Sequence, residues 1–435
     1  MNQPPPGGGY PPGGGYPPGG GGYPQGGGYP SSQQQQPQRS SGYGAPPGGY
    51  VAPPQQQAPA GPVVLPNPER TRRIVGLVIY IALVAIGLLL NIFFYLAEVF
   101  GSKTPTHVAH SIVIGFIFAT VPLGIYLFLP AVIDRFDPEP WWCLALAFFW
   151  GAIVATGFAG LFNSIAHEVL ASILGKKVGL IVTVSVVAPL CEEFFKGLAV
   201  FGVFYFLRRE FDGVVDGIIY ATFIALGFAC IENVQYYAHA SLSKSLAVTF
   251  VLRGVFAPWG HPLYTSMTGI GFGIARESSN TAVRILAPIA GYFAAVTLHA
   301  IWNFVPTVFG GGAFLVALIL WLMFVVCFLV MVIVLVVRKG RVIRDNLRDE
   351  VLLGNLTQDE VDLICSPIGR LRCTFSWRGK LGRDFIGSGA RLALSKWHTA
   401  RAMRGSKRTV SADFIVPMRN EIKRLRTELI AQMPR

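Results

Sequence analysis

Apolar residues are distributed unevenly along this chain. Behind a polar segment that ends near residue 68, long apolar stretches alternate with short polar connections up to residue 337. Each stretch is close to the roughly 20 residues that an α-helix needs to cross the hydrocarbon core of a bilayer. The pattern predicts an all-α, polytopic membrane helix bundle of about eight transmembrane helices, at about 74–97, 111–133, 142–162, 178–207, 214–237, 246–275, 283–304 and 313–337.

The segment before the first apolar stretch has a different composition. Residues 1–68 are rich in Gly, Pro, Gln and Tyr, repeat a GGGYPP-like motif, and contain almost no branched aliphatic residue before Val51. Such a segment cannot bury enough apolar area to offset the entropy of ordering, so we expect it to be disordered. The predicted organisation is a disordered tail (1–68), a transmembrane domain of eight helices (69–337) and a basic cytoplasmic tail (338–435).

Composition and charge agree with a membrane protein. The chain is 52% hydrophobic and 14% charged, so a bilayer must shield much of it from water. Residues 338–435 hold 21 of the 36 Lys and Arg against 10 of the 23 Asp and Glu, which gives this tail +11 of the net charge of +13. A basic tail beside a membrane is typical of attraction to anionic lipid headgroups. Nucleic acid is the less favoured partner of this tail. The helical spacing of residues in Phe414–Met433 predicts a terminal helix.

Positive charge also predicts the orientation. Counted from the N-terminus, the even-numbered connections carry Arg135, Arg208, Arg209, Arg276 and Arg284. The odd-numbered connections carry Lys103, Lys176, Lys177 and Lys244. By the positive-inside rule we expect both termini to be cytoplasmic, in the plasma membrane. Because the first apolar stretch begins near residue 74, we expect the first spanning helix itself to direct insertion.

Two smaller features complete the organisation. The mixed segment NSIAHEVLASILG (163–175) could form an amphipathic helix on the outer surface or a plain loop. The six cysteines are scattered without a C-x-x-C spacing, so we expect neither a disulfide framework nor a zinc ribbon.

The fourth stretch, VAPLCEEFFKGLAV, contains three charged residues near the middle of an apolar helix: Glu192, Glu193 and Lys196. Each charge at that depth costs about 2.5 to 3.5 kcal/mol on insertion scales. Lys196 lies four and three residues after the two glutamates, so it can reach either carboxylate. One ion pair would be enough to support helix packing, and a second carboxylate favours a functional role.

The fifth and sixth stretches add further polar groups. Glu232 and Asn233 follow several small residues that allow close helix approach, although Glu232 could be an interfacial residue. In RGVFAPWGHPLYTSMTG, prolines and glycine surround His261 and should break the helix, which is tolerated at that depth only around a polar cavity. Arg253 could pair with a carboxylate or lie at the interface.

The seventh stretch supplies His299, with Asn303 one turn later on the same face. Counted along the alternating helices, these groups and the earlier carboxylates lie near mid-membrane or somewhat toward the outer side. We therefore expect one cavity that opens outward to hold them.

Two mechanisms suit such a cavity. A glutamate can take the proton from water while histidine or asparagine stabilises the oxyanion. Alternatively, Glu and His side chains can hold a metal ion whose bound water is the nucleophile. The chain has no H-E-x-x-H motif, so spacing alone does not establish a metal.

The same segments resemble the PrsW family of intramembrane metalloproteases over roughly residues 75–337. The motifs that carry the resemblance are FDPEPW (136–141), EEFFK (192–196), GFACIEN (227–233), RGVFAPWGHPLYT (253–265) and HAIWN (299–303). The resemblance implies proteolysis of membrane-anchored proteins, such as anti-sigma factors, at a site that contains Glu192, Glu193, Glu232, His261 and His299. If the family mechanism uses a metal, the resemblance implies a divalent ion, with zinc as the preferred one, bound by Glu193, Glu232, His261 and His299. Lys196, Asn233 and Arg253 would then be supporting residues.

PrsW proteins are in turn distantly similar to the CAAX-prenyl-protease and bacteriocin-processing membrane proteases. That similarity implies a metal-free mechanism in which Glu192 or Glu193 activates water, and His261, His299 and Asn303 complete the catalytic pocket.

Two other classes of function stay open on the residues alone. Membrane carboxylates and histidines also form proton relays, so a proton-coupled transporter or channel is one alternative. It is weakened because only the sixth stretch looks broken, whereas transporters favour broken helices in both halves. A non-catalytic membrane scaffold or sensor is the other.

Overall fold

The computed structural model describes residues 68–432, apart from 134–135, 137, 367, 377 and 405–409. The predicted disordered tail therefore lies, except for its last residue, outside the described part. The described residues form helices and connecting turns without a β-strand, which confirms the all-α prediction.

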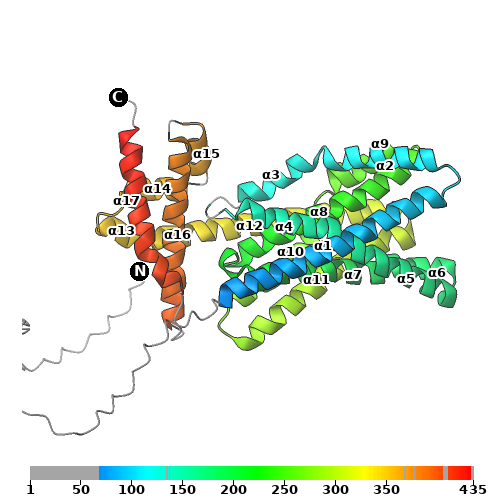
Figure 1. Cartoon of the computed structure of the whole chain (residues 1–435), viewed down its shortest axis with the longest axis horizontal. Coiled ribbons are helices and arrows are strands. Elements are labelled where there is room, and N and C mark those ends of the chain that lie inside the picture. Colours follow the sequence, from blue (N-terminus) through cyan, green and yellow to red (C-terminus); the bar gives the residue numbers. More distant parts are fainter. Residues whose placement is uncertain are drawn as a thin grey trace, which may run out of the picture. The chain divides into compact units, whose positions relative to one another are not determined.

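Most of the predicted spans are continuous helices (Figure 1). In the described part of the chain, seven helices are long and apolar enough to cross a membrane: Thr71–Gly101, Pro105–Phe128, Trp141–Leu174, Lys176–Phe206, Val214–Leu242, Thr281–Phe309 and Leu315–Leu352. Their elements are α1 (Pro68–Gly101), α2 (Pro105–Thr120), α3 (Leu123–Ile133), α4 (Trp141–Phe149), α5 (Thr156–Leu174), α6 (Lys176–Val182), α7 (Ala188–Phe206), α8 (Val214–Leu242), α11 (Thr281–Phe309) and α12 (Gly311–Asp345). Two π-helical segments, η1 (Trp150–Ala155) and η2 (Thr183–Val187), join α4 to α5 and α6 to α7.

The remaining predicted span, residues 246–275, is divided into two parts. α9 (Leu246–Phe250) and the π-helical η4 (Val251–Phe256) form one part, and α10 (Gly260–Glu277) forms the other. The break at residues 257–259 contains Pro258, which has no backbone N–H and disfavours the helical conformation of the residue before it. The predicted break is thus confirmed, and neither part is among the seven helices that are long and apolar enough to cross a membrane.

The segment 163–175 forms neither a separate surface helix nor a loop. α5 continues to Leu174, the chain turns at Gly175, and α6 begins at Lys176. Gly175 has a φ of 81°, a left-handed conformation that glycine adopts without a steric penalty. α5 and α6 therefore form a tight helical hairpin.

Successive helices run in alternate directions, so their connections lie at two ends of the bundle. We call the end with Gly175 and Gly310 the Gly175 end, and the end with the connections at 207–213 and 278–280 the tail end, because α12 leaves the bundle there (Figure 1).

α8 lies at the centre of the helix packing. It contacts α2, α4, η1, α7 and α10, and most of its side chains are buried. Small residues permit the closest approach: a Cβ on Gly217 would lie 2.2 Å from the carbonyl oxygen of Gly269 on α10. Such small-residue contacts are typical of helix association within membranes.

The C-terminal region folds into further helices, and their apolar core is continuous with Ile218 of α8 and with Val332 and Val336 of α12. The further helices are α13 (Arg348–Leu352), α14 (Gln358–Cys365), α15 (Gly369–Thr374), α16 (Gly379–Arg404), η5 (Val410–Phe414) and α17 (Ile415–Ala431). Ile343, Leu347, Ile364 and Leu425 are buried together there. α12 runs without interruption to Asp345, past the predicted domain boundary at residue 337, and the predicted terminal helix is confirmed as α17.

Candidate active site

The charged residues of the fourth stretch are buried on α7. Glu192 is 6% exposed, and Glu193 and Lys196 are fully buried. Lys196 Nζ lies 2.9 Å from Glu193 Oε1 and 3.5 Å from Glu192 Oε2, so the lysine contacts both carboxylates, as their spacing on the helix predicts. The same ammonium lies 3.8 Å from the centre of the Phe228 ring on α8.

Glu193 has both carboxylate oxygens engaged. Besides Lys196, Oε1 accepts from His299 Nδ1 of α11 at 3.1 Å, and Oε2 accepts from the Thr265 hydroxyl of α10 at 2.8 Å. One carboxylate therefore ties α7 to two neighbouring helices.

His261 lies in the first turn of α10, directly after the break. Its Nδ1 is 2.9 Å from Lys196 Nζ, and its Nε2 is 2.9 Å from Glu232 Oε2. An ammonium can only donate, so Nδ1 accepts and the ring proton lies on Nε2, which donates to Glu232. Hence both nitrogens of His261 are engaged.

Arg253 pairs with a carboxylate, one of the two places expected for it. Its guanidinium donates to Glu232 Oε2 at 2.5 Å and to Asn233 Oδ1 at 2.7 Å. It also stacks over the ring of Tyr236, at 3.6 Å from the ring centre. Glu232 is thus a member of the buried cluster and not an isolated interfacial residue.

The fold brings together every residue predicted for the site except Asn303. The amide of Asn303 donates to the backbone oxygen of Val184 in η2 at 3.0 Å. Two other residues, Thr265 and Tyr264, were not predicted. Tyr264 stacks on His299, with 5.1 Å between ring centres. Both follow His261 by three or four residues on α10, a helical spacing that could have indicated them.

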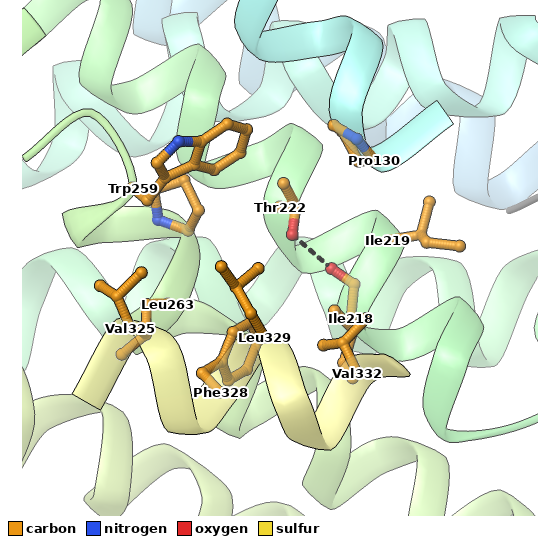
Figure 2. A pocket seen from close by; sticks show the side chains of 11 residues that line it. Pro130, Ile218, Ile219, Thr222, Trp259, Leu263, Val325, Phe328, Leu329 and Val332 are labelled. Carbon is orange, nitrogen blue, oxygen red and sulfur yellow. Dashed lines mark hydrogen bonds between the residues drawn. The ribbon is translucent and has the colours of Figure 1, made fainter. Parts of the chain in front are cut away.

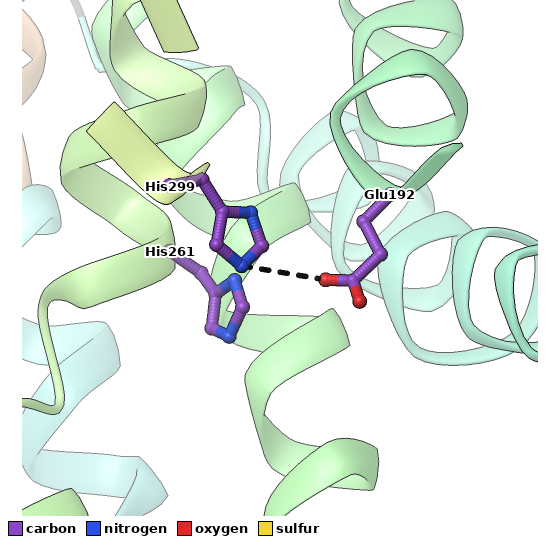
Figure 3. A group of neighbouring side chains, drawn as sticks. All are labelled: Glu192, His261 and His299. Carbon is purple, nitrogen blue, oxygen red and sulfur yellow. Dashed lines mark ion pairs between the residues drawn. The ribbon is translucent and has the colours of Figure 1, made fainter. Parts of the chain in front are cut away.

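Glu192, His261 and His299 form a group of possible metal ligands (Figure 3). One donor atom from each lies within 4.8 Å of the others. Glu192 Oε2 and His299 Nε2 face each other at 3.8 Å, and no described residue forms a hydrogen bond with Glu192 Oε2. A neutral His299 that donates through Nδ1 to Glu193 presents a lone pair at Nε2. Two acceptors therefore face a common point.

The chemical types of these three side chains suit a metal ion, and the geometry of two of them does so as well. One carboxylate and two imidazoles are typical ligands of catalytic zinc. Glu192 and His299 each offer an unengaged lone pair, whereas His261 would have to release Lys196 or Glu232. The grouping also differs from the predicted ligands, since Glu192 takes the place of Glu193 and Glu232.

A separate apolar pocket adjoins the broken helix (Figure 2). Trp259 and Leu263 line it beside the break, Ile218 and Thr222 line it from α8, and Val325 lines it from α12. The hydroxyl of Thr222 donates to the backbone oxygen of Ile218 at 2.7 Å. No ionisable side chain is among the described residues that line this pocket, so its surface is distinct from the carboxylate and histidine cluster.

Fold and site define a class: a polytopic helical membrane protein whose central helices bury carboxylates, imidazoles and a lysine in one cluster. The family described as "PrsW family intramembrane metalloprotease" matches residues 139–336, which include all of these groups. Over this region the predicted resemblance to the PrsW family is confirmed.

Individual relatives agree with this assignment. The chain is 35% identical over 116 residues to "Protease PrsW" of Oceanobacillus iheyensis, which is 27% of this chain and 50% of that protein. It is 28% identical over 190 residues to "Protease PrsW" of Clostridioides difficile, which is 44% of this chain and 78% of that protein. The chain thus spans half the length of the first of these relatives. No solved structure matches it.

Proposed function

We propose that this protein is an intramembrane endopeptidase, which hydrolyses peptide bonds of membrane-anchored protein substrates. The match to the PrsW family supports this function. So does the position of the cluster, because Glu192 and His299 lie ten or more residues from either end of their continuous helices. Intramembrane ionisable groups that line no functional site are costly and rare.

The observation that carries the proposal is the pair of facing acceptors, Glu192 Oε2 and His299 Nε2, at 3.8 Å. Two acceptors so close need a shared donor or cation, and a water molecule that donates to both has the geometry of a nucleophile beside its base. In this mechanism Glu192 takes a proton from the water while the water oxygen attacks the peptide carbonyl carbon. Glu192 then returns that proton to the leaving amine nitrogen.

The other residues orient these groups. Glu193 holds His299 through Nδ1, which leaves Nε2 as the acceptor. Glu232, which pairs with Arg253, holds His261 through Nε2, and Lys196 places a positive charge 3.5 Å from Glu192 Oε2. Positive charge fixed in a buried site stabilises negative charge that develops during the reaction.

The proposal extends to a metal ion. Glu192, His261 and His299 are the residues that would hold zinc, which when bound supplies Lewis-acid activation of water. A Glu192 oxygen that binds the zinc cannot also accept the proton, so in that case another group must be the proton acceptor. Metal analysis of the purified protein, together with chelator sensitivity of cleavage, distinguishes this version from the metal-free one.

The proposed setting is the plasma membrane, with both termini cytoplasmic and the Gly175 end outside. Arg208 and Arg276 lie at the tail end, whereas the basic residues in the connecting turns at the Gly175 end are all lysines. This distribution supports the proposed orientation. The basic helices α15 to α17 would then attract anionic lipid headgroups. Membrane-anchored regulators such as anti-sigma factors are the proposed substrates.

The test uses purified protein in liposomes with a single-pass membrane substrate. Glu192→Gln keeps the size of the side chain and removes its basicity, so we expect cleavage to fall by about 10² to 10⁴-fold. Glu98→Gln is the matched control, because Glu98 lies on α1 and contacts His239 outside the cluster. Cleavage by Glu192→Gln at the rate of the control would overturn the proposal.

A further inference from the structure

Several buried polar atoms near the site have no hydrogen-bond partner among the described residues. Four of them lie on α5, η2 and α7, which form and follow the hairpin at Gly175: Asn163 Oδ1, His167 Nδ1, Ser185 Oγ and Glu192 Oε2. Ser185 is 3% exposed and Glu192 6% exposed. Buried polar atoms are nearly always hydrogen-bonded in native proteins, and ordered water is the usual partner where the protein supplies none.

These atoms follow one direction along the hairpin. At the site, Asn163 Nδ2 lies 3.5 Å from Glu192 Oε1. His167 is four residues beyond Asn163 on α5, and Ser185 is seven residues before Glu192, so both are displaced toward Gly175. At about 1.5 Å per residue, the polar positions extend about 10 Å from Glu192 toward the Gly175 end.

On each side of the hairpin an exposed apolar residue lies beside the buried polar atoms. Ile165 lies between Asn163 and His167 and is 53% exposed, and Val186 follows Ser185 and is 49% exposed. The apolar neighbours thus face the surrounding lipid, while the unpaired polar atoms point into the protein. α5 and η2 contact each other directly, so the two sets of buried polar atoms lie on elements that pack together.

The proposed peptidase consumes one water molecule for each bond it cleaves, and the hydrocarbon around the bundle supplies none. We propose that water reaches Glu192 from the Gly175 end along a polar path formed by His167, Ser185 and Asn163. This inference rests on the proposed hydrolytic function. It assigns these residues a role in water access that neither the sequence motifs nor the catalytic cluster requires.

Cysteine accessibility tests the path in the full-length protein in liposomes. Ser185→Cys and His167→Cys place thiols on the path, and Val186→Cys and Ile165→Cys place thiols at matching depth on the lipid side. The probe is the silver ion, which is comparable to water in size and replaces the thiol proton. Thiols that remain are labelled with a maleimide after denaturation, and mass spectrometry quantifies the label at each position apart from the native cysteines.

We expect silver to block positions 185 and 167 at least about tenfold faster than 186 and 165, because thiol ionisation requires water. Equal rates within each pair would overturn the path. Reaction at 167 without reaction at 185 would also overturn it, since the path would stop short of Glu192. Silver labelling does not depend on peptide cleavage, so failure of the path and failure of the proposed protease activity are observed separately.

Discussion

Lys196 holds the buried charges of the site together, and its removal should be costly. Lys196→Met keeps the approximate length of the side chain and removes the ammonium. The change leaves Glu193 fully buried without its cation and deprives His261 Nδ1 of its donor. We expect the folded state to lose a large part of its stability.

The magnitude follows from the geometry. Both partners of the ion pair are fully buried and 2.9 Å apart, and breaking such a pair on one side costs about 3 to 5 kcal/mol. At about 2 to 4 °C per kcal/mol, the melting temperature should fall by about 6 to 20 °C. The double variant Lys196→Met with Glu193→Gln removes both charges, so its loss should be clearly smaller than the sum of the two single losses.

Thermal unfolding of the purified variants in detergent measures these differences. Lys177→Met is the matched control, because Lys177 is exposed on the same continuous helix and should change the stability by less than about 1 kcal/mol. Unfolding of Lys196→Met at the temperature of the control, or strictly additive losses in the double variant, would refute the reasoning.

Two further predictions concern helix packing and pH. A Cβ on Gly269 would lie 2.1 Å from the carbonyl oxygen of Gly217, so Gly269→Ala should lower the unfolding free energy by about 1 to 3 kcal/mol. Gly202→Ala, with no atom within 4 Å of its new Cβ, should be neutral or stabilising in the same unfolding assay; equal losses in both would contradict the packing argument. Burial, assisted by the charge of Arg276, lowers the pKa of His398 on α16 from 6.5 to about 4. The unfolded chain therefore binds the extra proton first, and stability should fall as the pH drops from 6.5 to 4. His398→Gln should flatten that dependence in melting curves, and an unchanged profile would contradict it.

The pattern of apolar stretches was enough to predict most of the fold. Seven spans lie where hydropathy placed them, and the sixth is broken beside Pro258 as its composition indicated. The segment 163–175 was harder, because its mixed polarity is equally compatible with a surface helix or a loop. Its continuation of α5 to Leu174 depends on packing against α6.

The candidate site was predictable in its members and not in their pairing. The cost of charge in a bilayer pointed to Glu192, Glu193 and His261 from sequence alone. The cost of charge could not decide which of the two adjacent glutamates keeps a carboxylate oxygen without a hydrogen bond, because adjacent residues have similar local surroundings. That choice depends on Thr265 and His299, which engage Glu193 and leave Glu192 Oε2 without a hydrogen bond from a described residue.

The sequence by itself determined that this chain spans a membrane, that ionisable groups lie at depth, and which family it resembles. These properties follow from local composition, because burial of a helix in lipid and the cost of a charge there depend on the residues of that helix. The tertiary structure alone decided that Arg253 pairs with Glu232, that Asn303 binds the backbone of Val184, and that Glu192 faces His299. Each of these contacts joins different helices, and their relative rotation is set by packing across the whole bundle.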